Sequence, residues 1–364
     1  MGTDSDCNNG FLLISKYRGA IMGLAALWIL IYHAWNPLLS ENAGGIQGVF
    51  SFLELYIKKV GFCGVDIFFL LSGFGLTYAI SKGSLFRFYY RRIRRIALPF
   101  LAICIVDAVF EKWSLAEFFK IVTGYYFYTQ DINFFLWFIY AIVILYLLFP
   151  AYYKLFSSVK NKVLFTSGVI VLWLLISLIL RDKIRLDIFG FTNRIPVFVI
   201  GILFGHVSKT YKEIRFTKGT YIFLLIAFAL GLYLQYLTRF LKIEFIIPDG
   251  KCFLPNLITA VCVSFLFAKL LDVFERHLKA FGKAVIAVFT FLGTFTVEMY
   301  CAQDFFPALI PLLRNDGWSN HMINVTIFFL VIATAWVESV IFKYILKLAD
   351  RCFDRNKTTA KVKG

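Results

Sequence analysis

Residues 17–35, YRGAIMGLAALWILIYHAW, decide the fold class of this chain. The stretch is apolar over a length close to the about 20 residues that a helix needs to cross a bilayer. Hydrophobic residues make up 60% of the 364 positions and charged residues only 16%, against about 25% charged in ordinary soluble domains. The sequence therefore predicts an integral membrane protein of the all-α class.

Further apolar blocks, separated by short charged stretches, follow along the whole chain. None alternates polar and apolar residues as a β-barrel strand does. No small-residue cleavage site follows the first block, so we expect it to stay as the first span. We predict about ten transmembrane helices, at 20–36, 60–80, 96–110, 134–153, 163–180, 195–208, 220–238, 252–268, 285–312 and 322–342. The expected organisation is an N-terminal segment 1–19, a transmembrane domain 20–342 and a basic tail 343–364.

The formal charge of +16 is interpreted as a topology signal. The basic residues are distributed among the segments between spans and are not gathered for nucleic acid, which we exclude as a partner. With the N-terminus inside, roughly two thirds of the 38 Lys and Arg residues lie on the cytoplasmic side, as positive-inside retention predicts. We expect both termini to be cytoplasmic. The 7 cysteines show no metal spacing, so no metal is expected.

Two ionisable residues belong to the first span, where charge is unfavourable. Arg18 and His33 are separated by about 22 Å of helical rise and roughly 60° of rotation, so they share one broad face at different depths. Arg18 is expected at the cytoplasmic edge and His33 toward the outer side. An ionisable residue at such a depth is a functional candidate that faces a cavity or a partner. The structural alternative is a histidine that only hydrogen-bonds a neighbouring helix.

The second span carries a carboxylate. Asp66, in GVDIFFLLSGFGLTYAI (residues 64–80), is expected at a depth comparable to that of His33. A carboxylate there could orient the imidazole and stabilise its protonated form, as in a general-base pair. Alternatively, Asp66 caps or anchors its helix.

A group of arginines precedes the third span, in FRFYYRRIRRIALP (residues 86–99). Guanidinium groups suit phosphate oxygens, which predicts a cytoplasmic donor that carries several phosphates. Anionic lipid head groups are the alternative ligand. The arginines are Arg87, Arg91, Arg92, Arg94 and Arg95.

Later spans carry further polar residues. Trp137 and Arg194 are expected at the outer interface, although a tryptophan there is also an ordinary belt residue. LGTFTVEMYCAQDFF, residues 292–306, places Glu298 and Gln303 inside the ninth span, where each is unfavourable unless it lines a polar cavity. These groups indicate a shared interior site, and we take them as candidates for substrate binding.

The order of these motifs resembles membrane acyltransferase family 3, the O-acyltransferases of bacterial surface polysaccharides. The resemblance covers essentially the whole chain and rests on R…H in the first span, GVDIFFLLSGF, FYYRRIRRI-LP, LWFIYAIVILYLLFP, RIPVFVIGILFG and LGTFTVEMYCAQ. It implies a multi-pass protein of the bacterial cytoplasmic membrane. The implied donor is acetyl-CoA or another acyl-CoA on the cytoplasmic side, and the implied acceptor is a glycan hydroxyl on or near the outer side.

The resemblance also implies roles for single residues. His33 matches the essential histidine of the first helix, and Asp66 matches the acidic residue of the GVD motif. Arg18 matches the first-helix arginine only loosely, because many members place it 11 residues before the histidine, where Met22 stands here. The residues that overlap the RxxR motif, and that are expected to bind the donor with Arg18, are Arg91, Arg92, Arg94 and Arg95.

The ninth span departs from the family pattern S-x-E-x-Y-x-x-H. Glu298 and Tyr300 match it, and Tyr300 joins the candidates for substrate binding. Gln303 stands where many relatives have a histidine, which leaves His33 as the strong candidate for the base.

The expected activity is transfer of an acetyl or other short acyl group from cytoplasmic acyl-CoA to a cell-surface or lipid-linked glycan. His33 would act as the general base or as the acyl carrier. A rival hypothesis is a proton-coupled transporter or exporter, in which His33, Asp66 and Glu298 form the proton path. An inactive scaffold is a third possibility. These motifs do not specify whether the acyl group is acetyl or succinyl. They also do not specify the acceptor glycan or the oligomeric state.

Overall fold

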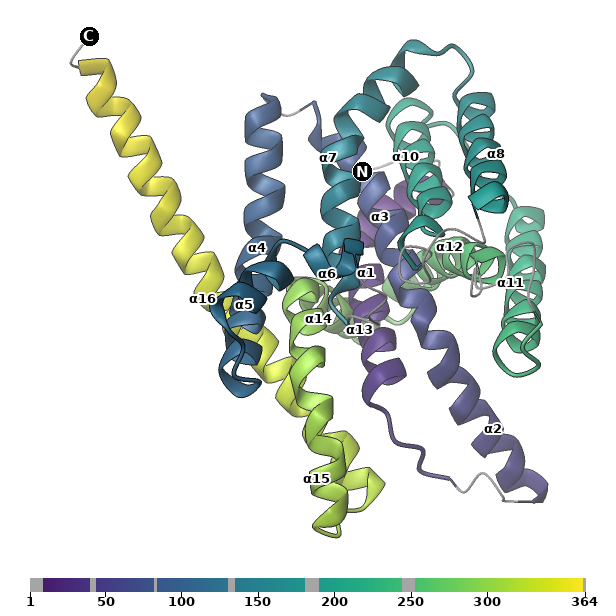
Figure 1. Cartoon of the computed structure of the whole chain (residues 1–364). Helices are drawn as coiled ribbons and strands as arrows, with labels where there is room; N and C mark the ends of the chain where they lie inside the picture. The colour runs from purple at the N-terminus through teal and green to yellow at the C-terminus, as the bar shows by residue number, and fades with distance from the viewer. Residues whose placement is uncertain are drawn as a thin grey trace.

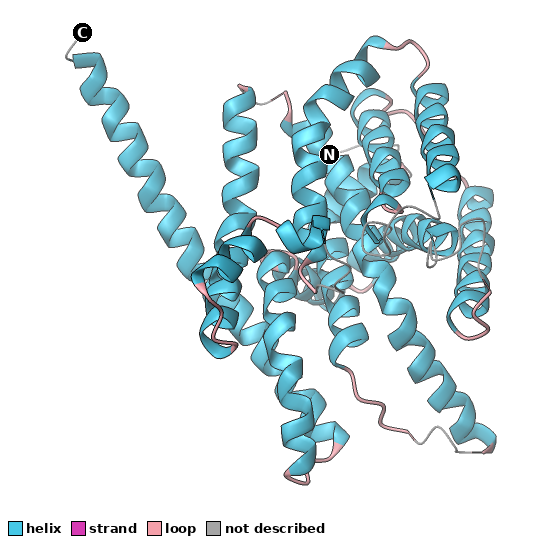
Figure 2. Ribbon diagram, in the orientation of Figure 1, coloured by secondary structure: helices cyan, strands magenta, loops and turns pink. Residues whose placement is uncertain are grey.

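The computed structural model describes residues 9–39, 44–81, 84–129, 135–180, 190–243 and 253–362, with side chains described up to residue 350. Every regular element in these ranges is a helix (Figure 2). The elements are α1 (Gly10–Ala34), α2 (Gly45–Val60), η2 (Gly61–Cys63), α3 (Gly64–Ala79), α4 (Leu85–Phe110), α5 (Leu115–Val122), α6 (Tyr125–Thr129), α7 (Trp137–Ser158), α8 (Lys162–Leu180), α10 (Ile195–Thr210), α11 (Lys218–Arg239), α12 (Phe253–His277), α13 (Lys279–Leu292), α14 (Thr296–Phe305), η3 (Phe306–Leu309), α15 (Ile310–Asn315) and α16 (Asn320–Val362).

The lengths and apolarity of these helices confirm a polytopic all-α membrane protein. Among the described residues, 8 helical segments are long and apolar enough to cross a membrane, and the bent pair of α13 with α14–α15 makes up to 9. α4 falls outside this criterion because arginines occupy its first half, although it packs along α7 and includes the expected third span.

Three of the differences from the expected spans concern α1, α16 and the expected ninth span. α1 begins at Gly10, capped by the Asn9 side chain, so the helix starts well before residue 20. α16 runs from Asn320 to Val362 without interruption, so no structural break separates the expected tail from the last span.

The third difference is that the expected span 285–312 is broken. α13 and the segment Thr296–Asn315 meet at 62°. At the break, Gly293 approaches α1 so closely that a Cβ there would lie 2.0 Å from the carbonyl oxygen of Gly19. Glycine and threonine are poor helix formers, which favours a break at this contact. α14 then starts anew and carries Glu298, Tyr300 and Gln303 into the bundle.

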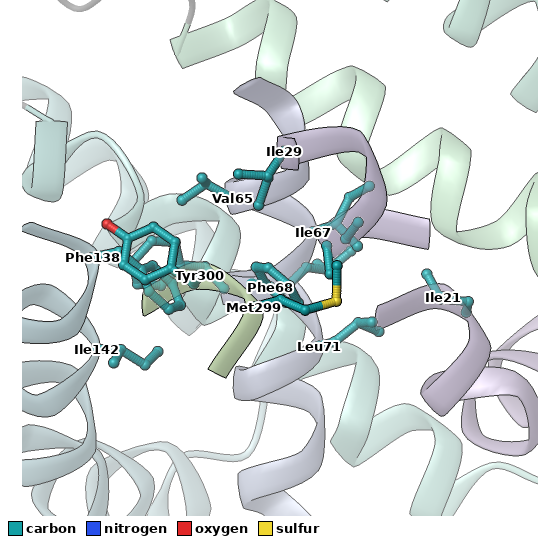
Figure 3. Close-up of a cluster of buried hydrophobic side chains, with 14 of the residues drawn as sticks. Ile21, Ile29, Val65, Ile67, Phe68, Leu71, Phe138, Ile142, Met299 and Tyr300 are labelled. Atoms are coloured by element: carbon teal, nitrogen blue, oxygen red, sulfur yellow. The ribbon is translucent and has the colours of Figure 1, made fainter. Parts of the chain in front are cut away.

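α1 and α3 form the centre of the bundle (Figure 1). α1 packs against α3, α10, α12, α13 and α14, and the contact between α3 and α10 is the most extensive one. Small residues allow that approach: a Cβ on Gly201 would lie 2.1 Å from the carbonyl oxygen of Leu70. Figure 3 shows apolar side chains from four helices meeting here, including Ile21, Ile67, Phe138 and Met299.

The bundle has two functional ends. We call the end at which α1 begins, and at which the arginines of α4 lie, the arginine end. We call the end at which α1 finishes at His33 the histidine end. α1 starts and α16 finishes in the upper part of Figure 1, whereas α2 and α15 project from the lower part.

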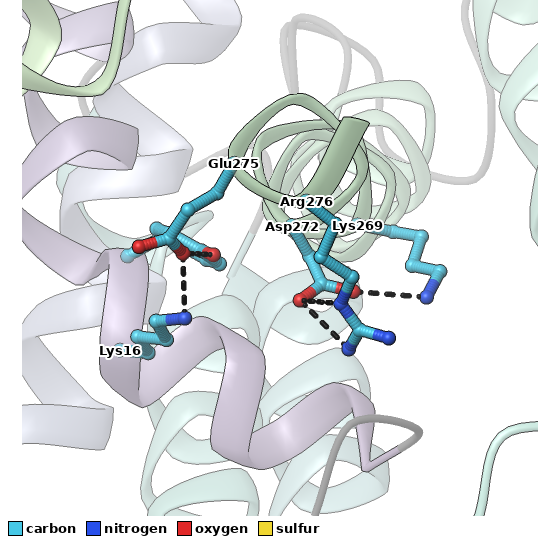
Figure 4. A network of polar contacts seen from close by, with 6 residues as sticks. Lys16, Lys269, Asp272, Glu275 and Arg276 are labelled. Atoms are coloured by element: carbon cyan, nitrogen blue, oxygen red, sulfur yellow. Dashed lines mark hydrogen bonds and ion pairs between the residues drawn. The ribbon is translucent and has the colours of Figure 1, made fainter. Parts of the chain in front are cut away.

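Polar contacts fasten α1 to α12 at the arginine end (Figure 4). Glu275 accepts hydrogen bonds from Lys16 Nζ at 2.6 Å and from the Tyr17 hydroxyl at 2.5 Å. Because these contacts flank Arg18 in the sequence, they hold the start of α1 in place beside the arginines of α4.

Candidate active site

His33 lies on the last turn of α1, partly exposed, among aromatic rings. Its ring centroid is 4.8 Å from that of Tyr32 and 4.7 Å from that of Phe135. The charge of Lys58, on α2, also acts on the imidazole. Within the described ranges no hydrogen bond restrains either ring nitrogen, so both are available to a reacting group.

Phe135 links His33 to α14. Its ring stacks on that of Tyr300 with 5.2 Å between centroids, and the Tyr300 hydroxyl donates to the Phe135 carbonyl oxygen. Phe135 lies at the start of the expected span 134–153 and carries no charge, so sequence reasoning did not single it out. The structure thus brings the Tyr300 side of α14 to the histidine.

The structure pairs Asp66 with side chains other than His33, so the general-base pair expected from the sequence is not formed among the described residues. Asp66 Oδ2 accepts a hydrogen bond from Asn256 Nδ2 at 3.0 Å, and its Oδ1 lies 3.6 Å from Arg194 Nε. Both ion-pair side chains are nearly fully buried, and no contact joins Asp66 to His33 in the described part of the chain. Asp66 therefore serves to hold Arg194, because removal of one partner would leave the other charge buried and unpaired.

Asn256 extends this network to α11. Gln235 Nε2 donates to Asn256 Oδ1 at 2.6 Å, and Arg239 Nε donates to Gln235 Oε1 at 3.1 Å. Sequence reasoning missed all three residues. The signal that could have found Gln235 and Asn256 is an amide inside an apolar run, where polar groups need a partner.

The two arginines of this network lie over aromatic rings near His33. The Arg194 guanidinium is 4.8 Å from the Phe62 ring and 5.4 Å from the Trp137 ring. The Arg239 guanidinium is 5.1 Å from the Phe62 ring and 5.9 Å from the Tyr32 ring. Trp137 and Arg194 were expected from the sequence at the outer interface. In the structure they lie together with the aromatic rings near His33.

Two cavities at the arginine end share Arg18 and Arg92. The first is also lined by Met22, Arg95 and Tyr146, and the second by Tyr78, Gly75, Arg87 and Arg91. The Arg18 guanidinium lies directly over the backbone of α3, where a Cβ on Gly75 would be 2.5 Å from its carbon. Arg18 Nε is buried and has no hydrogen-bond partner among the described residues.

Arg94 does not line either cavity. It forms an ion pair with Asp350 of α16, and its guanidinium lies 4.7 Å from the Tyr90 ring. The ion pair with α16, and not the position of Arg94 in the run of arginines, therefore distinguishes it from the others. The arginines of α4 that line the cavities are Arg87, Arg91, Arg92 and Arg95.

The polar residues of α14 lie on different sides of that helix. Glu298 is buried, and the charges of Arg95 and Lys343 act on it. Gln303 is 2% exposed, and its Oε1 has no hydrogen-bond partner in the part of the chain that is described. Asp304 lies close to Asp107 of α4. The structure therefore gathers Glu298 with the arginine end and Tyr300 with His33.

Comparison with known proteins identifies the family of the chain. A family model described as an acyltransferase domain matches residues 21–342, from within α1 to the middle of α16. No curated protein and no solved structure gives a match. The match covers most of the chain, including His33 and the arginines of α4, and begins three residues after Arg18. The chain therefore belongs to the acyltransferase 3 family and is a multi-pass membrane acyltransferase.

Proposed function

We propose that this acyltransferase moves an acetyl or other short acyl group from cytoplasmic acyl-CoA to a hydroxyl of a cell-surface or lipid-linked glycan. In this proposal it acts in the bacterial cytoplasmic membrane, with its arginine end in the cytoplasm. The observation that carries the proposal is that the two arginine-lined cavities share Arg18, which lies on the same helix as His33. α1 thus joins a phosphate-binding end to a base about 22 Å away.

The arginine end suits the phosphates of CoA. Arg87, Arg91 and Arg92 surround the second cavity, and planar guanidinium groups bind phosphate oxygens in a forked geometry. Apart from Arg18, Arg92 and Arg95, the first cavity is lined mainly by apolar side chains, including Met22 and Ile142. The uncharged pantetheine arm of the donor fits such a lining better than a charged lipid head group does.

At the histidine end, His33 would work as the general base. An imidazole nitrogen takes the proton of the acceptor hydroxyl, the hydroxyl oxygen bonds to the thioester carbonyl carbon, and the carbon–sulfur bond breaks. The proton then passes from the imidazolium to the CoA sulfur. In the carrier variant, the imidazole nitrogen bonds to the thioester carbonyl carbon and CoA leaves as the thiolate; the acceptor oxygen then takes the acyl group from the nitrogen, and the hydroxyl proton passes to the CoA sulfur. The ring nitrogens of His33, which carry no hydrogen bond from the described residues, support either course.

The test is acetyl-CoA turnover by the purified protein in nanodiscs, with free CoA detected by a thiol reagent. We expect slow CoA release by the wild type and a loss of about 10²–10⁴-fold in His33→Ala, the range for removal of a general acid or base. His277→Ala is the matched control, because His277 is exposed at the end of α12.

Two results would contradict the proposal. Turnover that His33→Ala does not reduce would remove the histidine from the chemistry. Folded wild type that neither binds nor cleaves acetyl-CoA would favour the proton-coupled transporter, which has no use for the donor.

A further inference from the structure

Around Arg194 and Arg239, the described residues of the histidine end include more cations than free carboxylates. Two carboxylates lie on the described parts of α2 and α3 near this end, and both are engaged. Glu54 accepts hydrogen bonds from Trp35 Nε1 at 2.8 Å and from the Leu38 backbone N–H at 2.8 Å. Asp66 is held by Asn256 and Arg194.

The cations of this end are only partly compensated. Arg194 is 2% exposed, and its NH2 group has no hydrogen-bond partner among the described residues. Arg239 uses its Nε for Gln235, and its two terminal nitrogens have no described hydrogen bond. The Lys59 ammonium lies 4.2 Å from the Phe240 ring, at the same end. Among the described residues, Asp66 is therefore the one carboxylate that faces these two guanidinium groups, and the net charge of the three groups is positive.

We propose that the acceptor glycan carries an anionic group, a carboxylate or a phosphate, and that Arg239 binds this group beside His33. This inference rests on the proposed function and names the chemical class of the acceptor. Arg239 makes the direct contact, and buried Arg194 adds positive charge behind it. Lys59 lies at the rim of the same surface.

The geometry joins this anion site to the base. Tyr32 is in ring contact with His33, and the Arg239 guanidinium lies over the same Tyr32 ring. All three side chains are partly exposed, as is that of Phe62. A sugar whose apolar face rests on Tyr32 would therefore bring a hydroxyl to His33 and an anionic substituent to Arg239 within the same or the adjacent sugar unit.

The site is also preorganised. The chain of hydrogen bonds from Asp66 through Asn256 and Gln235 fixes the Arg239 side chain, so little ordering remains when an anion binds. Its surroundings are aromatic, which lowers the local dielectric and strengthens the attraction between a guanidinium and an anion.

The experiment measures binding of small probes to the His33→Ala variant in nanodiscs of neutral lipid, by saturation-transfer NMR. The probes are methyl glucuronide with methyl glucoside as its neutral counterpart, and a short-chain prenyl phosphate with the corresponding prenol. We expect one anionic probe to bind at least about tenfold more tightly than its counterpart, as a charge-assisted hydrogen bond predicts. The probe that does so distinguishes an acidic sugar from a lipid-linked phosphate.

Arg239→Gln should abolish this preference, because it removes the charge and leaves an amide. Lys120→Gln, on α5, is the matched control and should keep the preference. If Arg239→Gln does not fold, Lys59→Gln is the second variant. It should weaken binding of the anionic probe by a smaller factor than the loss expected for Arg239→Gln. Equal binding of charged and neutral probes, or a preference that survives Arg239→Gln, would overturn the inference. The wild type's CoA release reports separately on the proposed function, since binding to His33→Ala needs no turnover.

Discussion

Arg18 and Met22 give the sharpest test of the donor site. Both line the first cavity, one helical turn apart on the same face of α1. Met22 stands where the resemblance to the family places the arginine of the first helix. We therefore predict that Arg18→Met impairs use of acetyl-CoA and that Met22→Arg, added to it, restores much of the loss.

The size of the effect follows from the contacts. A hydrogen bond between charged groups contributes about 1.5–3 kcal/mol, which corresponds to roughly 10–100-fold in donor affinity. The loss should appear as a higher KM for acetyl-CoA, because Arg18 is about 22 Å along the helix from His33. Moving the guanidinium by four residues shifts its attachment by about 6 Å along the axis and about 40° around it. A long arginine side chain spans much of that distance, so the double variant should recover the larger part of the affinity.

The assay is CoA release at a series of acetyl-CoA concentrations by protein in nanodiscs, which separates KM from kcat. Arg18→Lys serves as the intermediate case, since it keeps the charge and loses the forked geometry. If Arg18→Met leaves KM unchanged, the guanidinium does not contact the donor. If the single variant is impaired and Met22→Arg restores nothing, the cavity does not accept the arginine at either turn.

Two further predictions concern α4 and the contact of α3 with α10. Arg92→Gln should raise the KM for acetyl-CoA by about tenfold or more, because Arg92 lines both cavities. Arg94→Gln should leave the KM unchanged, because Arg94 is paired with Asp350 of α16. Equal changes of KM in the two variants would contradict these separate roles of Arg92 and Arg94. Gly201→Ala should lower the free energy of unfolding by about 1–3 kcal/mol, measured by thermal unfolding, because its Cβ would lie 2.1 Å from the Leu70 carbonyl oxygen. Gly168→Ala is the control for this assay and should not destabilise the protein, because a Cβ there meets nothing within 4 Å.

The membrane spans could be predicted from the sequence because their cause is local. A segment inside a bilayer must satisfy its own backbone hydrogen bonds, so length and apolarity alone indicate a helix. α1 carries Arg18 and His33 on one helix for the same reason, and this pairing needed no tertiary information. The break between α13 and α14 was not predictable, because it depends on the close approach of Gly293 to α1.

The partners of the polar residues also could not be predicted from the sequence. Asp66 and His33 were expected at similar depth, but depth does not fix the direction in which a side chain points. The rotation of α3 turns Asp66 toward Asn256 and Arg194. In the same way, the sequence places Arg94 in a run of arginines, whereas in the structure it forms an ion pair with Asp350.

The sequence by itself determined the all-α membrane class, most of the spans, the candidate base and the arginine-rich segment, since these follow from the composition and spacing of single segments. Only the tertiary structure decided which arginines share a cavity with Arg18, and that Asp66 anchors Arg194. Only the structure placed Arg239 over Tyr32 beside His33. The physical reason is that helix packing sets the rotation of each helix about its axis, and that rotation selects the partner of each buried charge.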